Sequence, residues 1–334
     1  MPPDPGAPFP DPATAAASYP RHVRALLVVN PRATTTGART RDVIARALSD
    51  AIDLDVADTT HRAHATDLAR QARLDGLDVV LVLGGDGTVN EVANGLLAEG
   101  PGHDVPVLGT IPGGSANVVA RSIGLPEDPV EATGVLIEAI EHKRSRTIGL
   151  GLAAFDGRQR WFLCNAGLGV DAEIIEEMER QRAAGHQATP ARYFQTAVRQ
   201  IVLKTERREP ALVVRRPGVA SVEGVFLTIV QNSSPWTFLG PLPIDPCPRA
   251  SFDTGLDLFA PRSLAVLHTL GHVRRMLLGR RTTYPFGGLL SLHDQSEITV
   301  EATRPTPLQI DGDAVGPVVS VTFRSVPRAL GVLV

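Results

Sequence analysis

The glycine-rich run Leu83–Glu91 constrains the fold of this 334-residue chain more than any other feature. An apolar stretch, Asp78–Val82, precedes the run, and helix-forming residues, Val92–Leu97, follow it. A strand that passes through a glycine turn into a helix forms an anion site. Glycines let the backbone approach a phosphate closely, and the N–H groups and dipole of the first helical turn favour negative charge. The run therefore predicts a phosphate-binding loop within an α/β unit.

An acidic side chain in a phosphate-binding loop needs a chemical reason. Asp86 would repel a polyphosphate unless it holds a hydroxyl of the nucleotide, or a magnesium ion that lies between it and the phosphates. A nucleoside triphosphate therefore fits the run better than bare phosphate. A plain turn between a strand and a helix is the alternative, but such a turn would tolerate almost any residue at Thr88, Asn90 and Glu91.

The composition excludes several classes of protein. A net charge of −3 gives the chain no overall basic field, so no nucleic-acid partner is expected. Lys143 and Lys204 are the only lysines, and neither stands in the G-x-x-x-x-G-K-[ST] context of a P-loop NTPase. Cys164 and Cys247 lie far apart without a metal-ligand spacing, so a reducing, cytoplasmic location is expected.

The N-terminal residues 1–20 are rich in proline, alanine and aspartate, and they lack the basic start and the apolar core of a signal peptide. We expect them to form a disordered tail. No stretch of the chain reaches the roughly 18–20 uninterrupted apolar residues of a membrane span. Any contact with a membrane is therefore expected to be peripheral.

From residue 21 to residue 146, short apolar strands alternate with helical segments, which is typical of a Rossmann-like α/β domain with a mostly parallel sheet. Ligands bind such sheets at the carboxyl ends of the strands. Asn30-Pro31, the glycine run and the turn Ile111–Asn117 all fall at such ends, so they are expected to converge on one crevice. The expected elements are Ala25–Val29, Ala38–Ser49, Leu54–Ala57, Ala63–Leu74, Val79–Leu83, Val89–Ala98 and Val105–Ile111.

After Arg146 the pattern changes to strands with few helical partners, which predicts an antiparallel β-sandwich over residues 147–321. Its expected strands are Trp161–Leu168, Ala211–Arg215, Val225–Gln231, Leu256–Phe259, Glu297–Ala302, Pro307–Ile310 and Val318–Phe323. Its expected helices are Asp171–Arg182, Arg192–Lys204 and Ser263–Gly279. The last helix has arginines alongside it, which suit either a solvated face or a surface that meets anionic lipid headgroups.

Seven motifs in order resemble the diacylglycerol kinase catalytic family, which includes bacterial lipid kinases and the sphingosine kinases. The resemblance extends from about Val23 to the C-terminus, and it implies an N-terminal domain like that of the NAD kinases and phosphofructokinases, followed by a β-sandwich. A final segment, about residues 322–334, is implied to return and complete the first domain. The motifs are Asn30-Pro31 with Gly37, Thr60–Ala65, Gly84–Glu91, Ile111–Asn117 with Ala120-Arg121, Asn165–Gly169, Phe252–Leu258 and Ile310–Asp313.

The resemblance implies that ATP and Mg²⁺ are the cofactors, and that residues of four motifs line the nucleotide. Ser115 stands where the family usually has threonine, and serine keeps the hydroxyl. The implied binding residues are Asn30, Pro31, Gly37, Thr60, Gly84, Gly85, Asp86, Gly87, Thr88, Asn90, Glu91, Gly114, Ser115 and Asn117.

The segment Asp311-Gly312-Asp313 resembles the family's Asp-Gly-Glu, whose last carboxylate is thought to take the proton from the lipid hydroxyl. Asp313 is therefore the first candidate for the general base, and Asp311 is the second. Aspartate is one methylene shorter than glutamate, which moves the carboxylate by roughly 1.5 Å, and proton transfer requires hydrogen-bond reach. A simple β-turn between two strands is the alternative for this segment.

A structural magnesium is the second feature in which the chain departs from the family. Members often carry Asp-Gly-Leu in the sandwich, whereas this chain has Thr254 at the aspartate's position. Asp253 is the candidate replacement ligand, although neighbouring residues on an extended chain point to opposite faces. His61 and His64 fit a solvated helix start better than a metal or acid–base role.

The leading hypothesis is an ATP-dependent lipid kinase that phosphorylates a lipid hydroxyl at a membrane surface, with diacylglycerol converted to phosphatidic acid. A kinase of sphingoid or other lipids, an NAD kinase-like enzyme and a non-catalytic nucleotide- or lipid-binding regulator remain alternatives. The segment Asn232–Trp236 is interpreted as a turn, with substrate contact as the alternative. Edge strands of the sandwich are able to pair across a two-fold axis, so a homodimer also remains an alternative.

Overall fold

The computed structural model describes residues 23–33, 37–169, 210–265 and 288–334, together with single positions 268, 269, 271, 272, 274 and 276. The predicted tail at residues 1–20, the turn residues Thr34–Thr36 and the helices expected at Asp171–Arg182 and Arg192–Lys204 lie outside the described residues. Eight of the 17 residues of the helix expected at Ser263–Gly279 do so too. In the part of the chain that is described, no helix is long and apolar enough to cross a membrane.

The N-terminal half contains a parallel sheet in the order β4-β3-β1-β2. Its strands are β1 (Arg24–Val29), β2 (Asp53–Asp58), β3 (Val79–Gly84) and β4 (Val107–Pro112). Every residue of β3 is buried, as expected for a central strand that is covered on both faces. The predicted α/β fold class is confirmed in this half.

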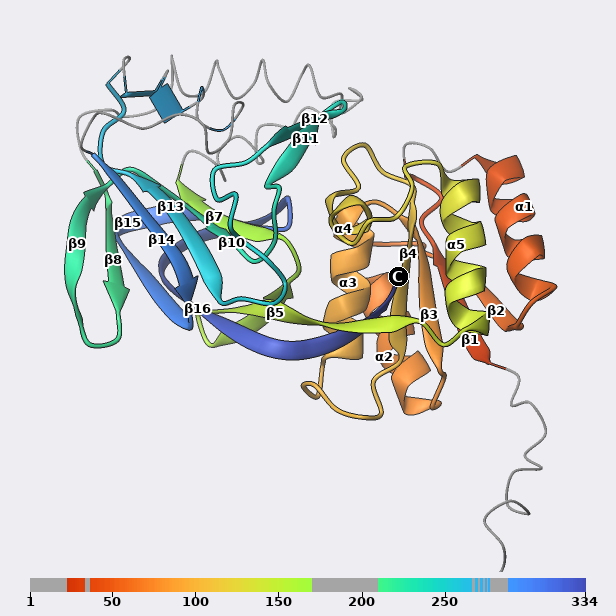
Figure 1. Ribbon diagram of the computed structural model, residues 1–334. Helices are drawn as coiled ribbons and strands as arrows, with labels where there is room; N and C mark the ends of the chain where they lie inside the picture. Colours follow the sequence, from red (N-terminus) through yellow and green to blue (C-terminus); the bar gives the residue numbers. More distant parts are fainter. Residues whose placement is uncertain are drawn as a thin grey trace, which may run out of the picture.

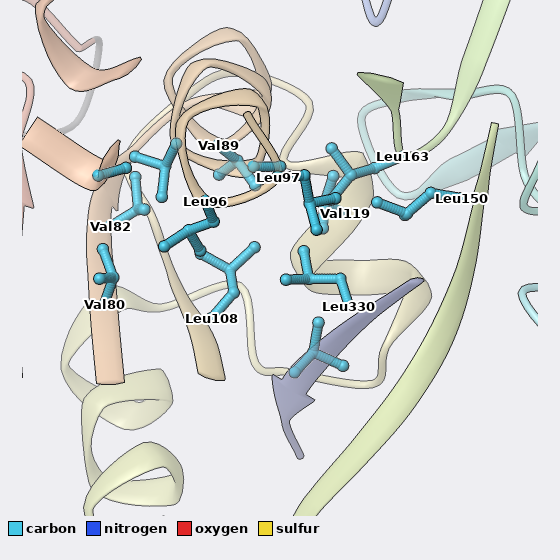
Figure 2. Close-up of a cluster of buried hydrophobic side chains, with 14 of the residues drawn as sticks. Val80, Val82, Val89, Leu96, Leu97, Leu108, Val119, Leu150, Leu163 and Leu330 are labelled. Carbon is cyan, nitrogen blue, oxygen red and sulfur yellow. The ribbon is translucent and has the colours of Figure 1, made fainter. Parts of the chain in front are cut away.

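Helices cover both faces of this sheet (Figure 1). Alternate residues of β1 and β3 divide between two apolar clusters because successive side chains of a strand point to opposite faces. One face is covered by α1 (Ala38–Ser49) and α5 (Pro129–Glu141), and the other by α2 (His64–Leu74), α3 (Asp86–Leu96) and α4 (Val118–Ser122). In Figure 2, Val80 and Val82 of β3 point toward α3.

One helix begins earlier than its sequence pattern predicts. We expected a helix at Val89–Ala98, but α3 begins at Asp86, with Gly85 as its N-cap residue. The last part of the glycine run is therefore the first helical turn and not a loop before it. Gly87 consequently lies inside the helix N-terminus, where backbone N–H groups lack partners within the helix.

The C-terminal half consists mainly of antiparallel strands that pack on a separate apolar cluster. This agrees with the predicted fold class. The strands are β5 (Ser145–Phe155), β6 (Arg158–Phe162), β7 (Asn165–Gly169), β8 (Leu212–Arg216), β9 (Val219–Val225), β10 (Leu227–Gln231), β13 (Leu256–Pro261), β14 (Leu289–Gln295), β15 (Glu297–Ile310) and β16 (Asp313–Leu333), with the separate hairpin β11 (Thr237–Leu239) and β12 (Leu242–Ile244).

Several predicted strand boundaries were wrong in this half, and in two places the error changes how the segment is divided into strands. The single strand expected at Trp161–Leu168 is divided into β6 and β7, because the backbone N–H groups of Leu163, Cys164 and Asn165 donate to the side chain of Asp311. Conversely, the two strands expected within residues 297–310 form one strand, β15.

Strand β16 connects the two halves. It is 21 residues long and pairs antiparallel with β15 and β5 before Val332 pairs parallel with Leu108 of β4. Leu330 packs in the same apolar cluster as Leu108 and Val119, as Figure 2 shows. Because one continuous sheet runs through both halves, the predicted domain boundaries near residues 146 and 322 stay a prediction.

Candidate active site

Two glycine turns meet backbone to backbone at the carboxyl ends of β3 and β4. The N–H of Gly113 donates to the carbonyl of Gly84 at 2.9 Å. A Cβ placed on Gly114 would lie 2.7 Å from the Cα of Gly85, so this contact has no room for a side chain. Asn117 holds the second turn in place, since its side chain accepts from the N–H and donates to the carbonyl of Gly114. The structure thus brings these predicted nucleotide residues together.

Asp86 contacts another helix of the protein. Its carboxylate accepts the backbone N–H of Val119 at 3.0 Å, in the first turn of α4. Burial raises the pKa of Asp86, while hydrogen bonds from backbone N–H groups at the start of α4 act in the opposite direction. The side chain therefore stabilises the N-terminus of α4. Its expected contact with a nucleotide hydroxyl or with magnesium stays a prediction.

Asn30 and Thr88 lie together across the same edge of the sheet. Asn30 Nδ2 donates to Thr88 Oγ1 at 2.9 Å, and Asn30 Oδ1 accepts the N–H of Arg32 at 3.0 Å. The two neighbouring candidates Pro31 and Gly37 are exposed, and Gly37 is the N-cap residue of α1. The hydrogen bond between Asn30 and Thr88 thus connects the loop after β1 to the N-terminal turn of α3.

Thr60 and Glu91 both contact the start of α2. Thr60 Oγ1 lies 2.8 Å from Nδ1 of His61 and 3.2 Å from Nδ1 of His64, and the two rings stack with centroids 4.8 Å apart. Glu91 Oε1 accepts the N–H of Ala63 at 3.0 Å. The described contacts of these residues thus connect α2 to α3. A direct contact with nucleotide remains a prediction.

Asn90 connects α3 to the C-terminal half. The residue is only 1% exposed. Its Nδ2 donates to Asp311 Oδ2 at 2.9 Å and to the carbonyl of Trp161 at 2.8 Å. Its Oδ1 accepts from Nε and Nη2 of Arg160 at 3.0 and 2.6 Å. Both polar atoms of this amide are therefore occupied within the protein, so its contacts organise the site.

Asp311 lies in the hairpin turn that joins β15 to β16. Asp311 and Gly312 both have positive φ angles, 46° and 81°, and Ile310 pairs with Asp313 across the turn. Such a two-residue hairpin favours Asp-Gly, because both positions require the left-handed region. The segment is therefore a β-turn, as the alternative interpretation expected, and this turn also positions two carboxylates.

The Asp311 carboxylate is buried and fully engaged. Besides Asn90, it accepts the backbone N–H groups of Leu163, Cys164 and Asn165 at 2.7, 2.9 and 2.9 Å. Burial raises the pKa of Asp311, and these hydrogen bonds oppose the increase. Burial, together with the nearby Asp311 carboxylate, also raises the pKa of the Cys164 thiol. These contacts make Asp311 a weaker candidate for the base than Asp313.

Asp313 faces the glycine run. Its Oδ1 lies 3.3 Å from the position that a Cβ on Gly87 would take, in the first turn of α3. Its Oδ2 accepts Nη2 of Arg160 at 2.7 Å, and the side chain is 24% exposed. A partly exposed carboxylate next to a helix N-terminus is positioned to meet a substrate hydroxyl beside a bound phosphate.

Sequence reasoning assigned no role to two arginines, Arg160 and Arg121, although Arg121 belongs to one of the seven motifs. Arg160 contacts Asn90 and Asp313, as described above. Arg121 of α4 lies with its guanidinium 3.3 Å from the ring centroid of Phe238, and it also pairs with Glu127 at 2.9 Å. It thereby connects α4 to the β11–β12 hairpin, which lies near α4 in Figure 1. Arg160 stands in none of the motifs, and the motif that contains Arg121 does not indicate its contacts, so only the fold identifies the partners of both side chains.

The remaining candidates have different surroundings. Ser115 is exposed in the second glycine turn. Asp253 is also exposed, and it forms an ion pair with Arg146. Within the described ranges, no group of three or more His, Cys, Asp or Glu residues is arranged to hold a metal ion. The geometry therefore gives the predicted metal role of Asp253 no support.

The first residue of the segment Asn232–Trp236 is buried inside the protein. Asn232 is fully buried, and its Nδ2 donates to the carbonyls of Gly149 and Leu163 at 2.9 and 2.8 Å. The carbonyl of Trp236 accepts Nδ2 of Asn165 at 3.2 Å. These contacts favour a structural turn over substrate contact at Asn232.

Comparison with known proteins identifies the catalytic-domain family. Residues 24–152 match the family model of the diacylglycerol kinase catalytic domain. The match confirms the predicted resemblance over these residues. The matched segment contains both glycine turns and Arg121, whereas Arg160, Asp311 and Asp313 lie beyond it.

Relatives of known name align with part of the chain. The diacylglycerol kinase of Bacillus subtilis (strain 168) is 40% identical over 94 residues, which is 28% of this chain and 29% of that protein. The lipid kinase YegS of Escherichia coli (strain K12) is 35% identical over 102 residues, or 30% of this chain and 33% of that protein. Each alignment thus spans a third or less of the relative's length.

Solved structures share the fold over nearly the whole chain. The crystal structure of a diacylglycerol kinase from Bacillus anthracis str. Sterne aligns with a TM-score of 0.68, covers 94% of this chain and 97% of that chain, and is 20% identical. A second structure from the same strain aligns with a TM-score of 0.73 at 20% identity and the same coverage. At this identity the likeness establishes the two-part architecture and not the activity.

Proposed function

We propose that this protein is an ATP-dependent lipid kinase that transfers the γ-phosphoryl group to a lipid hydroxyl, with diacylglycerol as acceptor and phosphatidic acid as product. One observation carries the proposal: the Asp313 carboxylate from the C-terminal half lies against Gly87 in the first turn of α3. A carboxylate there can accept the proton of a hydroxyl that attacks a phosphate at the helix N-terminus. The family of residues 24–152 and the names of the relatives support kinase chemistry.

The proposed reaction depends mainly on positioning and on stabilisation of charge. Backbone N–H groups in the first turn of α3 bind the ATP phosphates, because those of Gly113 and Gly114 already donate within the protein. The Mg²⁺ that accompanies ATP neutralises part of the phosphate charge. As the acceptor oxygen attacks the γ-phosphorus, its proton passes to Asp313, and the bond from the γ-phosphorus to the bridging oxygen breaks to release ADP.

The lipid acceptor determines where the reaction takes place. A substrate with two acyl chains stays in a bilayer or micelle, so the proposal includes peripheral contact with a membrane surface. Diacylglycerol is preferred over sphingoid acceptors because the catalytic-domain family and the Bacillus subtilis relative carry that name. NAD and other soluble acceptors remain alternatives for the experiment to separate.

The decisive experiment is transfer of labelled phosphate from γ-labelled ATP with Mg²⁺. The acceptors are diacylglycerol, monoacylglycerol, ceramide and a sphingoid base in mixed micelles, with NAD and no acceptor in parallel. We expect label in diacylglycerol. Label in another lipid would correct the acceptor, and label in NAD would overturn the lipid proposal. ATP binding with no transfer to any acceptor would favour a nucleotide-binding regulator.

A further inference from the structure

Arg160 is the cation that joins the base candidate to the phosphate-binding helix. Its guanidinium donates through Nη2 to Asp313 Oδ2 at 2.7 Å, and through Nε and Nη2 to Asn90 Oδ1 at 3.0 and 2.6 Å. Arg160 and Asp313 are 23% and 24% exposed, so water screens this ion pair less than a surface pair. The planar fork of arginine fixes both partners in one geometry.

The two oxygens of Asp313 have different surroundings. Oδ2 is held by Arg160, whereas Oδ1 lies beside Gly87. A carboxylate rotates about its last bond unless one oxygen is fixed, so the contact with Arg160 determines which oxygen faces the first turn of α3. Asn90 fixes Arg160 in turn, because its own Nδ2 is bound to Asp311 and to a backbone carbonyl.

A base in this position has an electrostatic problem. An ionised carboxylate next to ATP phosphates is repelled by them, and that repulsion disfavours both ATP binding and the ionised form that accepts a proton. Arg160 supplies the compensating charge. Asp311, the other carboxylate near Asn90, already accepts three backbone N–H groups in addition to Asn90. Among the residues that the structure describes, Arg160 forms an ion pair with Asp313 only.

We infer that Arg160 is a positioning residue for phosphoryl transfer, which aims the Asp313 carboxylate at the first turn of α3 and neutralises it against the ATP phosphates. This inference rests on the proposed kinase function. It assigns to Arg160 two separable effects. Its charge supports ATP affinity, and its fork supports the rate of transfer.

The test compares Arg160→Gln, Arg160→Lys, Asp313→Asn and the double variant Arg160→Gln/Asp313→Asn. Affinity for Mg-ATP is measured by calorimetry without lipid, and kcat is measured with the lipid that the wild-type protein phosphorylates. Arg158→Gln is the matched control, since Arg158 lies on the same strand with its side chain 63% exposed. We expect this control to match the wild-type protein in both measurements.

Arg160→Gln is expected to weaken Mg-ATP binding about tenfold, because the Asp313 charge is then uncompensated. The double variant should recover the affinity of the wild-type protein within about threefold, since both charges are absent. Arg160→Lys should keep the ATP affinity but lower kcat about tenfold, because lysine keeps the charge and lacks the fork. The lysine variant also serves if the glutamine variant is unstable.

Two outcomes would overturn the inference. One is an Arg160→Gln variant whose ATP affinity and kcat stay within about twofold of the wild-type values. The other is a double variant that binds ATP no better than Arg160→Gln. Failure of the proposed function would give a different result, namely that the wild-type protein phosphorylates no lipid. The affinity measurements still test the inference in that case, because they need no lipid acceptor.

Discussion

The two sides of the β15–β16 turn carry carboxylates with opposite surroundings. Asp311 is 7% exposed, and four N–H donors surround it. Asp313 is 24% exposed, with one oxygen on Arg160 and the other beside Gly87. The Asp311 carboxylate connects the strands to α3 through its hydrogen bonds, whereas Asp313 has one oxygen near the proposed phosphate site. Residues of the same chemistry, two positions apart, are thus suited to assembly and to proton transfer respectively.

Asp86 extends the comparison to the phosphate-binding turn. Like Asp311, it receives backbone N–H groups from a neighbouring segment, and burial raises its pKa. Its position in a glycine run suggests ligand contact, whereas its described hydrogen bonds stabilise α4. The role of a carboxylate in a glycine-rich turn should therefore be assigned only when its hydrogen-bond partners are known.

The largest expected effect is on catalysis at Asp313. Asp313→Asn removes the base with little change in volume, so we expect phosphate transfer to fall by roughly 10²–10⁴-fold. Mg-ATP binding should be retained. Single-turnover transfer and calorimetric ATP binding measure the two effects. Asp42→Asn is the control, because that side chain is 72% exposed on α1. Transfer within about tenfold of the wild-type rate would exclude Asp313 as the general base.

The second effect is on stability at Asp311. Asp311→Ala leaves buried N–H donors without their acceptor, and we expect the free energy of unfolding to fall by about 3–5 kcal/mol. Asp313→Ala should cost about 1 kcal/mol or less, because its pair with Arg160 is partly solvated. Urea denaturation of both variants gives the difference. Equal losses would contradict the contrast between the two carboxylates.

The third effect concerns the contact between the two glycine turns. A methyl group at Gly114 would lie 2.7 Å from the Cα of Gly85. Gly114→Ala should therefore destabilise the protein by about 1–3 kcal/mol and weaken Mg-ATP binding as the turns separate. Gly134→Ala is the matched control in α5, where a Cβ meets nothing within 4 Å. The control should stabilise the helix by about 0.5–1 kcal/mol. Unchanged ATP affinity in Gly114→Ala would show that the contact is not needed for binding.

The smallest effect is a pH dependence of stability from Asp86. Because the pKa of Asp86 is raised in the folded protein, the unfolded chain releases this proton first as the pH rises above 3.8. The group's contribution to stability is therefore present at lower pH and is lost as pH rises through the folded pKa. The free energy of unfolding of Asp86→Asn minus that of the wild-type protein should therefore increase with pH. Urea titrations from about pH 4 to pH 7 measure it. A constant difference would contradict the raised pKa.

Much of the N-terminal half could be predicted because its signals are local. The helix Ala38–Ser49 matches α1 at both ends, and the strand expected at Val79–Leu83 differs from β3 by one residue. Helical and strand periodicities, and glycine turns, act over a few residues. The family resemblance was likewise readable, since its motifs occur in order along the chain. The start of α3 was missed because glycines in its first turn resemble a loop.

Only the tertiary structure decided which residues are the partners of the charged groups. Asn90 meets Asp311 across 221 residues of sequence, and Arg160 meets Asp313 across 153. The sequence by itself determined the alternation of strands and helices, the glycine turns and the Asp-Gly hairpin, because backbone conformation follows from nearby residues. It left the roles of Asp86, Asp311 and Asp313 open, since burial and hydrogen bonding of a carboxylate depend on segments that only folding brings together.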